Sequence, residues 1–178
     1  IDAPAWWSEA HPDELLRLSN GETSFGDKLF ALPRAGELPS IASEVWRADM
    51  KRVIGALIDH VAQSDYGARV AGYQVTGQKT QEWYHWSMNT PELGDYSAPM
   101  VKAWRDWLRA RYGSDDALRT AWRQPDATLN SAAIPSKEER YGAPDGTFRD
   151  PVTEAHVIDF HRFWSDIMAD TIAYFAGV

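Results

Sequence analysis

The stretch VAGYQVTGQKTQEWYHWSMN, residues 70–89, decides the fold class that this sequence predicts. It opens with a short apolar run over residues 70–75, which lies between the turn residues 65–67 and Gly77. An apolar run without polar alternation is typical of a strand that is buried on both faces in a parallel sheet. Because a helical pattern precedes this run, the sequence indicates one piece of a repeating strand–helix unit and therefore an α/β protein.

Four helices are predicted around this strand. Apolar residues recur every three or four positions over residues 44–63, which is the pattern of a helix with one buried face. Capping residues mark the other helices, because Ser and Asp are favoured at helix starts and Gly at helix ends. The predicted helices, with their caps, are 44–63 after Ser43, 98–112 between Ser97 and Gly113, 115–124 after Ser114, and a long helix from Pro151 after Asp150. We therefore expect a helix-rich chain with few strands.

Composition narrows the class of protein. The chain has 178 residues, enough to bury roughly 70% of its unfolded surface. Its formal net charge of −8, with no run of Lys or Arg, argues against a nucleic-acid partner and against an anionic membrane surface. It has no Cys, so it has no disulfide framework. Neither a membrane-spanning run of ~20 apolar residues nor a signal-peptide pattern is visible. The sequence does not predict the cellular compartment.

Glu82 is the candidate catalytic residue. It follows the C-terminal end of the predicted strand and is succeeded by four aromatic side chains, at residues 83–86. In parallel α/β folds, the loops at this end of the strands build the active site. A carboxylate packed against rings loses hydration, which raises its pKa and suits it to donate a proton near neutral pH. The alternative is an ordinary solvated glutamate on a loop.

Aromatic residues outside the helical patterns are candidate sugar platforms. Trp7, Trp83 and Trp86 lie in non-periodic segments, where a ring is free to stack on a sugar face. Core packing is the competing interpretation for each ring. His85 is a candidate for orienting a substrate or relaying a proton, or else for simple packing. No set of residues has metal-ligand spacing, and no Gly-rich phosphate loop or Ser-centred nucleophile motif is present, so neither a metal nor nucleotide chemistry is predicted.

Several segments, taken in order, resemble a known enzyme family. They are APAWWSEAHPDEL, RVAGYQVTGQKTQEW, WRDWLRARYGSDDALRTAW and VIDFHRFWSD. Together they look like bacterial glycoside hydrolases related to the family-42 β-galactosidases, whose catalytic domain is a (β/α)8 barrel. The resemblance implies that residues 1–178 form a single region of that barrel. This region would run from the loop after the third strand to the helix that precedes the fifth strand.

The resemblance also implies the chemistry. The segment Gly72-Tyr73-Gln74-Val75 is similar to the family's fourth barrel strand, which makes Glu82 the general acid/base of a retaining glycosidase. Gln81 stands where the family has Asn, and four additional residues separate the strand from the glutamate. The family's nucleophile comes from a late strand with no counterpart in this chain, so the chain alone is expected to be inactive.

The implied substrate is a carbohydrate, and no cofactor is needed. Gln81, Tyr84 and His85 would fix sugar hydroxyls, while Trp7, Trp83 and Trp86 would stack on the sugar ring. The expected partner is the remainder of the barrel or a second copy of the chain. Two other functions stay open from sequence: a non-catalytic carbohydrate-binding module that uses the same rings, and a purely structural α-rich domain whose tryptophans are all core.

Overall fold

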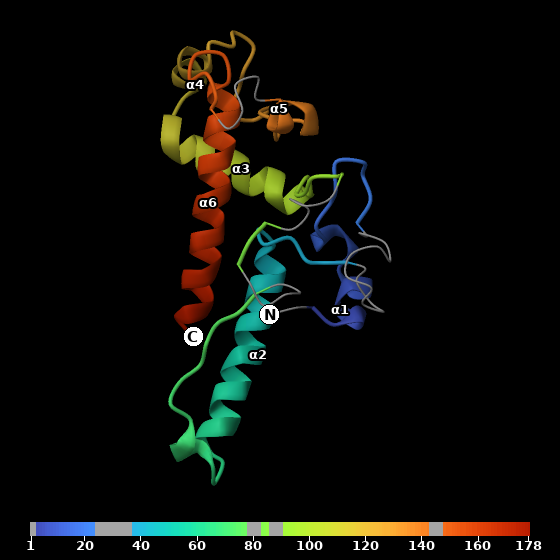
Figure 1. Ribbon diagram of the computed structural model, residues 1–178, viewed down its shortest axis with the longest axis vertical. Helices are drawn as coiled ribbons and strands as arrows, with labels where there is room; N and C mark the ends of the chain where they lie inside the picture. Colours follow the sequence, from blue (N-terminus) through green and yellow to red (C-terminus); the bar gives the residue numbers. More distant parts are fainter. Residues whose placement is uncertain (1–2, 24–36, 78–82, 86–90, 143–147) are drawn as a thin grey trace.

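The computed structural model describes residues 3–23, 37–77, 83–85, 91–142 and 148–178. Its α-helices are α1 (Ala5–Ala10), α2 (Glu44–Ala62), α3 (Ala98–Tyr112), α4 (Asp115–Trp122), α5 (Lys137–Tyr141) and α6 (Ala155–Ala176). Two 3₁₀ turns, Pro12–Glu14 and Gly67–Arg69, follow α1 and α2. In Figure 1 the long helices α2 and α6 run along the long axis of the molecule. Helix α3 crosses α6, and α4 and α5 lie above α3 in this view. None of the helices in the described ranges is long and apolar enough to cross a membrane.

Local capping chemistry accounts for the starts of α2, α3 and α4. The hydroxyls of Ser43, Ser97 and Ser114 each accept a hydrogen bond from the backbone N–H three residues later. Such a bond satisfies one of the amide groups that a helix start leaves unpaired. Gly113 ends α3 in the left-handed conformation, at φ 72°, which a residue without a Cβ adopts at little cost. The predictions of these three helix starts and of the end of α3 are confirmed.

The predicted start of the last helix is wrong. Residues 151–153 form a turn, and α6 begins at Ala155. The Asp150 carboxylate accepts bonds from the Val152 N–H and the Thr153 hydroxyl, which closes a turn instead of opening a helix. The short helices α1 and α5 were not predicted, although a capping box formed by Ser136 and Glu139 starts α5. That motif was a readable signal in the sequence.

Most of the core lies between α3, α4 and α6. Trp104 of α3 is fully buried, and its ring contacts those of Trp122 on α4 and Phe160 on α6. A second cluster joins α1, α2 and the end of α6 through Trp7, Trp46 and Phe175. Burial of large rings is the main source of stability in such small clusters, because each ring removes a large apolar area from water.

A buried carboxylate ties the three helices of the main core together. Asp159 of α6 accepts hydrogen bonds from the Tyr112 hydroxyl at the end of α3 and from the Trp122 indole N–H of α4, the latter at 2.9 Å. Arg111 and Arg162 add ion pairs at 3.5 and 3.3 Å. A charge can stay buried when several donors replace its lost water, as they do here.

The predicted buried strand over residues 70–75 is wrong for this structure. Val70 has extended backbone angles, but no ladder forms, and most of the segment is exposed. A strand persists in a core only when neighbouring strands pair with its backbone groups. Within the described residues there is no such strand, and Leu15 and Pro39 form an isolated antiparallel bridge.

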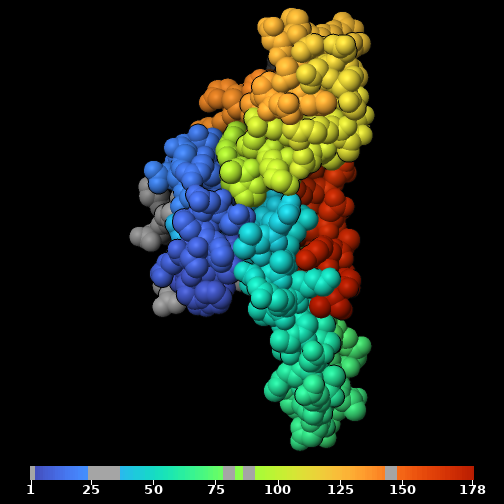
Figure 2. Space-filling view, turned by 180° about the vertical axis from the view of Figure 1, so that it is seen from behind, coloured from blue at the N-terminus to red at the C-terminus, as the bar shows by residue number. Residues whose placement is uncertain are grey.

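The apolar face predicted for the helix over 44–63 is buried only near its start. Trp46 and Met50 are buried, whereas Val53 is 59% and Leu57 is 53% exposed. Figure 2 shows the reason: the C-terminal half of α2 and the loop after it project beyond the rest of the molecule. The helical periodicity was read correctly, but the described part of the chain covers this half of the face only partly, because Ile54 is half-buried while Val53 and Leu57 stay exposed.

Candidate functional site

The segment around the candidate acid/base is described only in part. Glu82, Gln81 and Trp86 lie outside the described residues. Trp83, Tyr84 and His85, which directly follow Glu82 in sequence, are described. Their contacts show how the chain next to Glu82 is held.

Trp83 links the two flanks of residues 78–82. Its indole N–H donates a hydrogen bond of 3.0 Å to the carbonyl oxygen of Val75. Its ring lies against Gly77 so closely that a Cβ built on this glycine would be 2.6 Å from ring carbons. The close approach of the Trp83 ring therefore requires a glycine at position 77. The ring of Trp83 packs on its own chain, whether or not it also contacts a sugar.

Replacing Gly77 with alanine is expected to displace Trp83. The added methyl cannot fit at 2.6 Å from an aromatic ring, so the ring has to move, at a cost of about 1–3 kcal/mol. Chemical denaturation followed by tryptophan fluorescence measures this cost. Gly72→Ala is the matched control, since a Cβ at Gly72 meets nothing within 4 Å. Equal stability of the two variants would contradict the packing role of Gly77.

Tyr84 and His85 are anchored on different parts of the molecule. Tyr84 packs against a small cluster of Leu16, Leu18 and Leu38. His85 reaches α6, where its ring stacks on Trp164 with 3.8 Å between ring centroids and an angle of 26° between planes. The His85 Nε2 atom is 2.7 Å from the backbone oxygen of Trp164. Because a carbonyl oxygen only accepts, Nε2 carries the proton and Nδ1 of the neutral ring is the acceptor.

The environment of His85 keeps its imidazole neutral. Burial is the main cause that lowers the pKa of His85 to about 3; the bond to the Trp164 backbone opposes this shift, and the neighbouring Arg140 and His161 add to it. A histidine with this pKa is not an imidazolium near neutral pH, so it is a poor proton donor there. The geometry therefore favours orientation or packing over proton relay for His85.

The neutrality of His85 predicts a pH dependence of stability. The unfolded chain takes up a proton at His85 below its ordinary pKa of 6.5, while the folded chain does so only near 3. Stability from this residue is therefore lost as the pH falls from about 6.5 towards 3. As the pH falls from 7 to 4, the denaturation midpoint should decrease less steeply for His85→Gln than for the wild type. The exposed control His60→Gln should show the same slope as the wild type. A slope identical in all three proteins would contradict the burial of a neutral imidazole.

Trp7 does not lie on an open surface. Its side chain is 0% exposed, and its indole N–H donates a 2.8 Å bond to Asp49 of α2. Of the two interpretations of this ring, core packing is the one that the structure shows. Its neighbour Trp6 is 66% exposed.

Among the described residues, the predicted site and the cavities meet at His85. A groove of ≈ 840 Å³ lies between α2, α3 and α6, and no described residue of the predicted site lines it. His85, Asp95 and Trp164 line a cavity of ≈ 10 Å³, about the space of one water molecule. The described residues also include no group of three side chains with the geometry to hold a metal ion.

Comparison with known proteins decides the family. The family model described as β-galactosidase, glycoside hydrolase family 42, matches residues 2–176. The chain belongs to this family. A curated relative, the β-galactosidase BbgII of Bifidobacterium bifidum, is 25% identical over 171 residues, which are 94% of this chain and 21% of that protein.

Solved β-galactosidases share the fold of this family-42 chain. The enzyme of the psychrophilic Marinomonas ef1 matches with a TM-score of 0.61 and 19% identity, over 98% of this chain and 24% of its own. That of Bacillus circulans sp. alkalophilus matches with a TM-score of 0.62 and 18% identity, over 98% and 23%. The chain thus spans about a fifth to a quarter of the length of these relatives. The described residues form helices and no sheet, which is consistent with part of a barrel enzyme.

Sequence reasoning missed the residues that surround His85 in the family-42 chain. Trp164, Arg140 and Asp95 were not singled out as site residues. Asp95 is buried and accepts backbone bonds from Arg17 and Ser97, at 3.1 and 2.8 Å, while burial raises the pKa of its carboxyl. The contacts of Trp164 with His85 and Arg140, and of Asp95 with Arg17, join segments far apart in sequence, so no local pattern marks them.

Proposed function

We propose that this family-42 chain supplies the acid/base part of a retaining β-galactosidase site. In this proposal the chain is a region of a (β/α)8 barrel, from the loop after the third strand to the helix before the fifth. The single observation that carries it is the anchored segment Trp83–His85, which fixes the backbone directly after Glu82 on two sides. A general acid acts only when it is held at a defined place relative to the bond it protonates.

Glu82 would act in both halves of the reaction. As a carboxylic acid it would protonate the glycosidic oxygen while a second carboxylate attacks the anomeric carbon. As a carboxylate it would then remove a proton from the water that hydrolyses the glycosyl–enzyme intermediate. Retaining enzymes need the two carboxyl groups about 5–5.5 Å apart. By resemblance to the family, the nucleophile would come from a later strand outside this chain.

The sugar contacts follow from the same arrangement. Tyr84 and Gln81 would hold hydroxyl groups, and Trp83 and Trp86 would offer apolar faces to the ring. His85, kept neutral, would orient a hydroxyl through its acceptor nitrogen or hold the segment in place. The partner that completes the site would be the remainder of the barrel. The mechanism uses no metal or organic cofactor.

The test is galactoside hydrolysis by the gene product that contains these residues, with and without Glu82→Gln. Proton NMR of the first-formed product identifies its anomer, and the β-anomer is expected. An α-anomer as the first product would rule out the retaining mechanism. Tight galactoside binding without any turnover would instead favour a carbohydrate-binding module.

A further inference from the structure

The guanidinium group of Arg140 is buried among aromatic rings. The residue is 5% exposed, and within the described part of the chain its buried Nε, Nη1 and Nη2 atoms have no hydrogen-bond partner in good geometry. Burial lowers the pKa of this arginine from its ordinary value, against smaller opposing effects of Tyr96 and Asp95. Leaving a charge in this state is costly, so its position calls for a compensating interaction.

Aromatic faces provide that interaction. The guanidinium carbon lies 4.2 Å from the ring centroid of Trp164, 4.9 Å from that of Phe160 and 5.5 Å from that of Tyr96. A cation over an indole face is the strongest of such pairs, and it gains strength when water is excluded. The planar guanidinium also stacks, which the ammonium group of a lysine cannot do.

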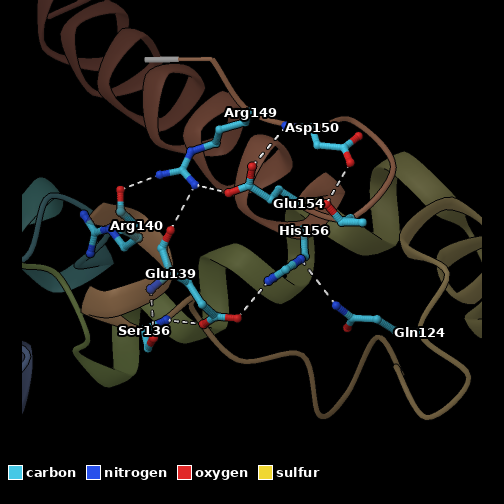
Figure 3. Close-up of polar contacts among 9 residues, drawn as sticks. Gln124, Ser136, Glu139, Arg140, Arg149, Asp150, Glu154 and His156 are labelled. Carbon is cyan, nitrogen blue, oxygen red and sulfur yellow. Dashed lines mark hydrogen bonds and ion pairs between the residues drawn. The ribbon is translucent and has the colours of Figure 1, made fainter. Parts of the chain in front are cut away.

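The backbone of Arg140 is fixed from the start of α6. Arg149 donates hydrogen bonds to the carbonyl oxygens of Glu139 and Arg140 and pairs with Glu154 at 2.6 Å. His156, on the same helix, binds the Glu139 carboxylate at 2.9 Å. Figure 3 shows that Arg149 binds the carbonyl oxygen of Arg140, while the side chain of Arg140 points away from this network. The network therefore holds α5 in place and leaves the guanidinium for the aromatic cluster.

We propose that Arg140 is a positioning residue, whose guanidinium clamps Trp164 so that this ring holds His85 and the segment after Glu82. The inference rests on the proposed function for its catalytic meaning. The contact chain is short: Arg140 lies over Trp164, and Trp164 stacks on His85 at 3.8 Å and accepts its N–H at 2.7 Å. An apolar side chain of similar length would fill the space with less desolvation, so space filling alone does not account for an arginine here.

The charges around His85 agree with this role. Arg140 and His161 both oppose protonation of His85, and Asp95 lines the same small cavity as His85 and Trp164. A neutral ring stacks on the indole without bringing a second cation next to Arg140. Burial is the main cause of the neutral imidazole, and the charge of Arg140 acts in the same direction.

The experiment uses histidine-labelled 178-residue chain and NMR of the imidazole C–H groups, with His85 assigned through His85→Gln. In the wild type, the ring current of Trp164 should shift the His85 signals upfield of those of the exposed His60. Arg140→Met should bring the His85 signals to the His60 range. Arg140→Lys, which keeps the charge but lacks the plane, should produce at least half of that movement. Arg69→Met, at an exposed arginine, should leave them unchanged.

Helical circular dichroism accompanies each spectrum. Unmoved His85 signals in a folded Arg140→Met chain overturn the proposal. If that variant unfolds, unmoved signals in folded Arg140→Lys overturn it equally. Loss of helix in both variants assigns Arg140 a role in core stability alone, which also overturns it.

Kinetics separate this proposal from the proposed function. In the galactoside-hydrolysing gene product, Arg140→Met is expected to lower kcat about tenfold with KM within about twofold, because misplacement of a reacting group affects the transition state more than binding. A shifted His85 with unchanged kcat rejects the positioning role. Unchanged turnover in Glu82→Gln rejects the proposed function instead, and leaves the NMR result for the clamp intact.

Discussion

Glu82→Gln is expected to lower kcat/KM for an alkyl β-D-galactoside by about 10²- to 10⁴-fold, the range that general acid–base catalysis contributes. Glutamine keeps the size of the side chain and its ability to hydrogen-bond, but it cannot donate a proton to the leaving oxygen. For a dinitrophenyl galactoside, kcat/KM of this variant should fall less than about tenfold, because the dinitrophenolate leaves without being protonated. Steady-state kinetics of both substrates measure the difference in the galactoside-hydrolysing gene product.

The control for this variant is Glu9→Gln, at an exposed glutamate on α1. It should leave both substrates unaffected. Equal losses for the alkyl and the dinitrophenyl substrate in Glu82→Gln would contradict the acid role, because they would show a defect that does not depend on proton donation. Binding of galactose, followed by tryptophan fluorescence, should remain within a few-fold of the wild type.

Asp159→Ala is expected to produce the largest loss of stability in the main core. It leaves the buried Trp122 indole N–H and the Tyr112 hydroxyl without their acceptor and removes the carboxylate that joins α3, α4 and α6. Unpaired buried donors cost about 1–3 kcal/mol each, so we expect a loss of about 3 kcal/mol. Urea denaturation followed by circular dichroism measures it.

Asp166→Ala is the matched control on the same helix. Asp166 also accepts an indole N–H bond, from Trp107 at 2.9 Å, but its side chain is exposed. Water replaces the lost acceptor there, and the cost should be below about 1 kcal/mol. A similar loss in both variants would contradict the view that burial, and not the bond itself, sets the cost at Asp159.

The sequence predicted the helices better than the site. The starts of α2, α3 and α4 were predicted correctly because a capping serine acts within one turn of its own helix. The position of Asp150 was misread because its carboxylate serves a turn equally well, and a choice between turn and cap depends on contacts with Arg149 and Glu154. The predicted strand failed because strand formation requires partners that local sequence does not reveal.

For the candidate site, the sequence selected the segment after Glu82, and the structure adds the contacts that hold the described part of this segment. Trp83, Tyr84 and His85 were chosen from their place after Glu82, and the catalytic role of Glu82 itself stays a prediction. The burial of Trp7, the neutral state of His85 and the position of Arg140 over Trp164 were not predictable, because each depends on contacts between residues that are distant in sequence.

By itself, then, the sequence determined the starts of α2, α3 and α4 with their capping serines, the acidic and cysteine-free character, and the family. These properties depend on residues close together in the chain or on composition. Only the tertiary structure decided which part of the apolar face of α2 is covered and that residues 70–75 form no strand pairing. It also decided that a buried arginine lies over Trp164. Burial and pairing are set by whatever segments meet in space, and those meetings carry no signature in either partner alone.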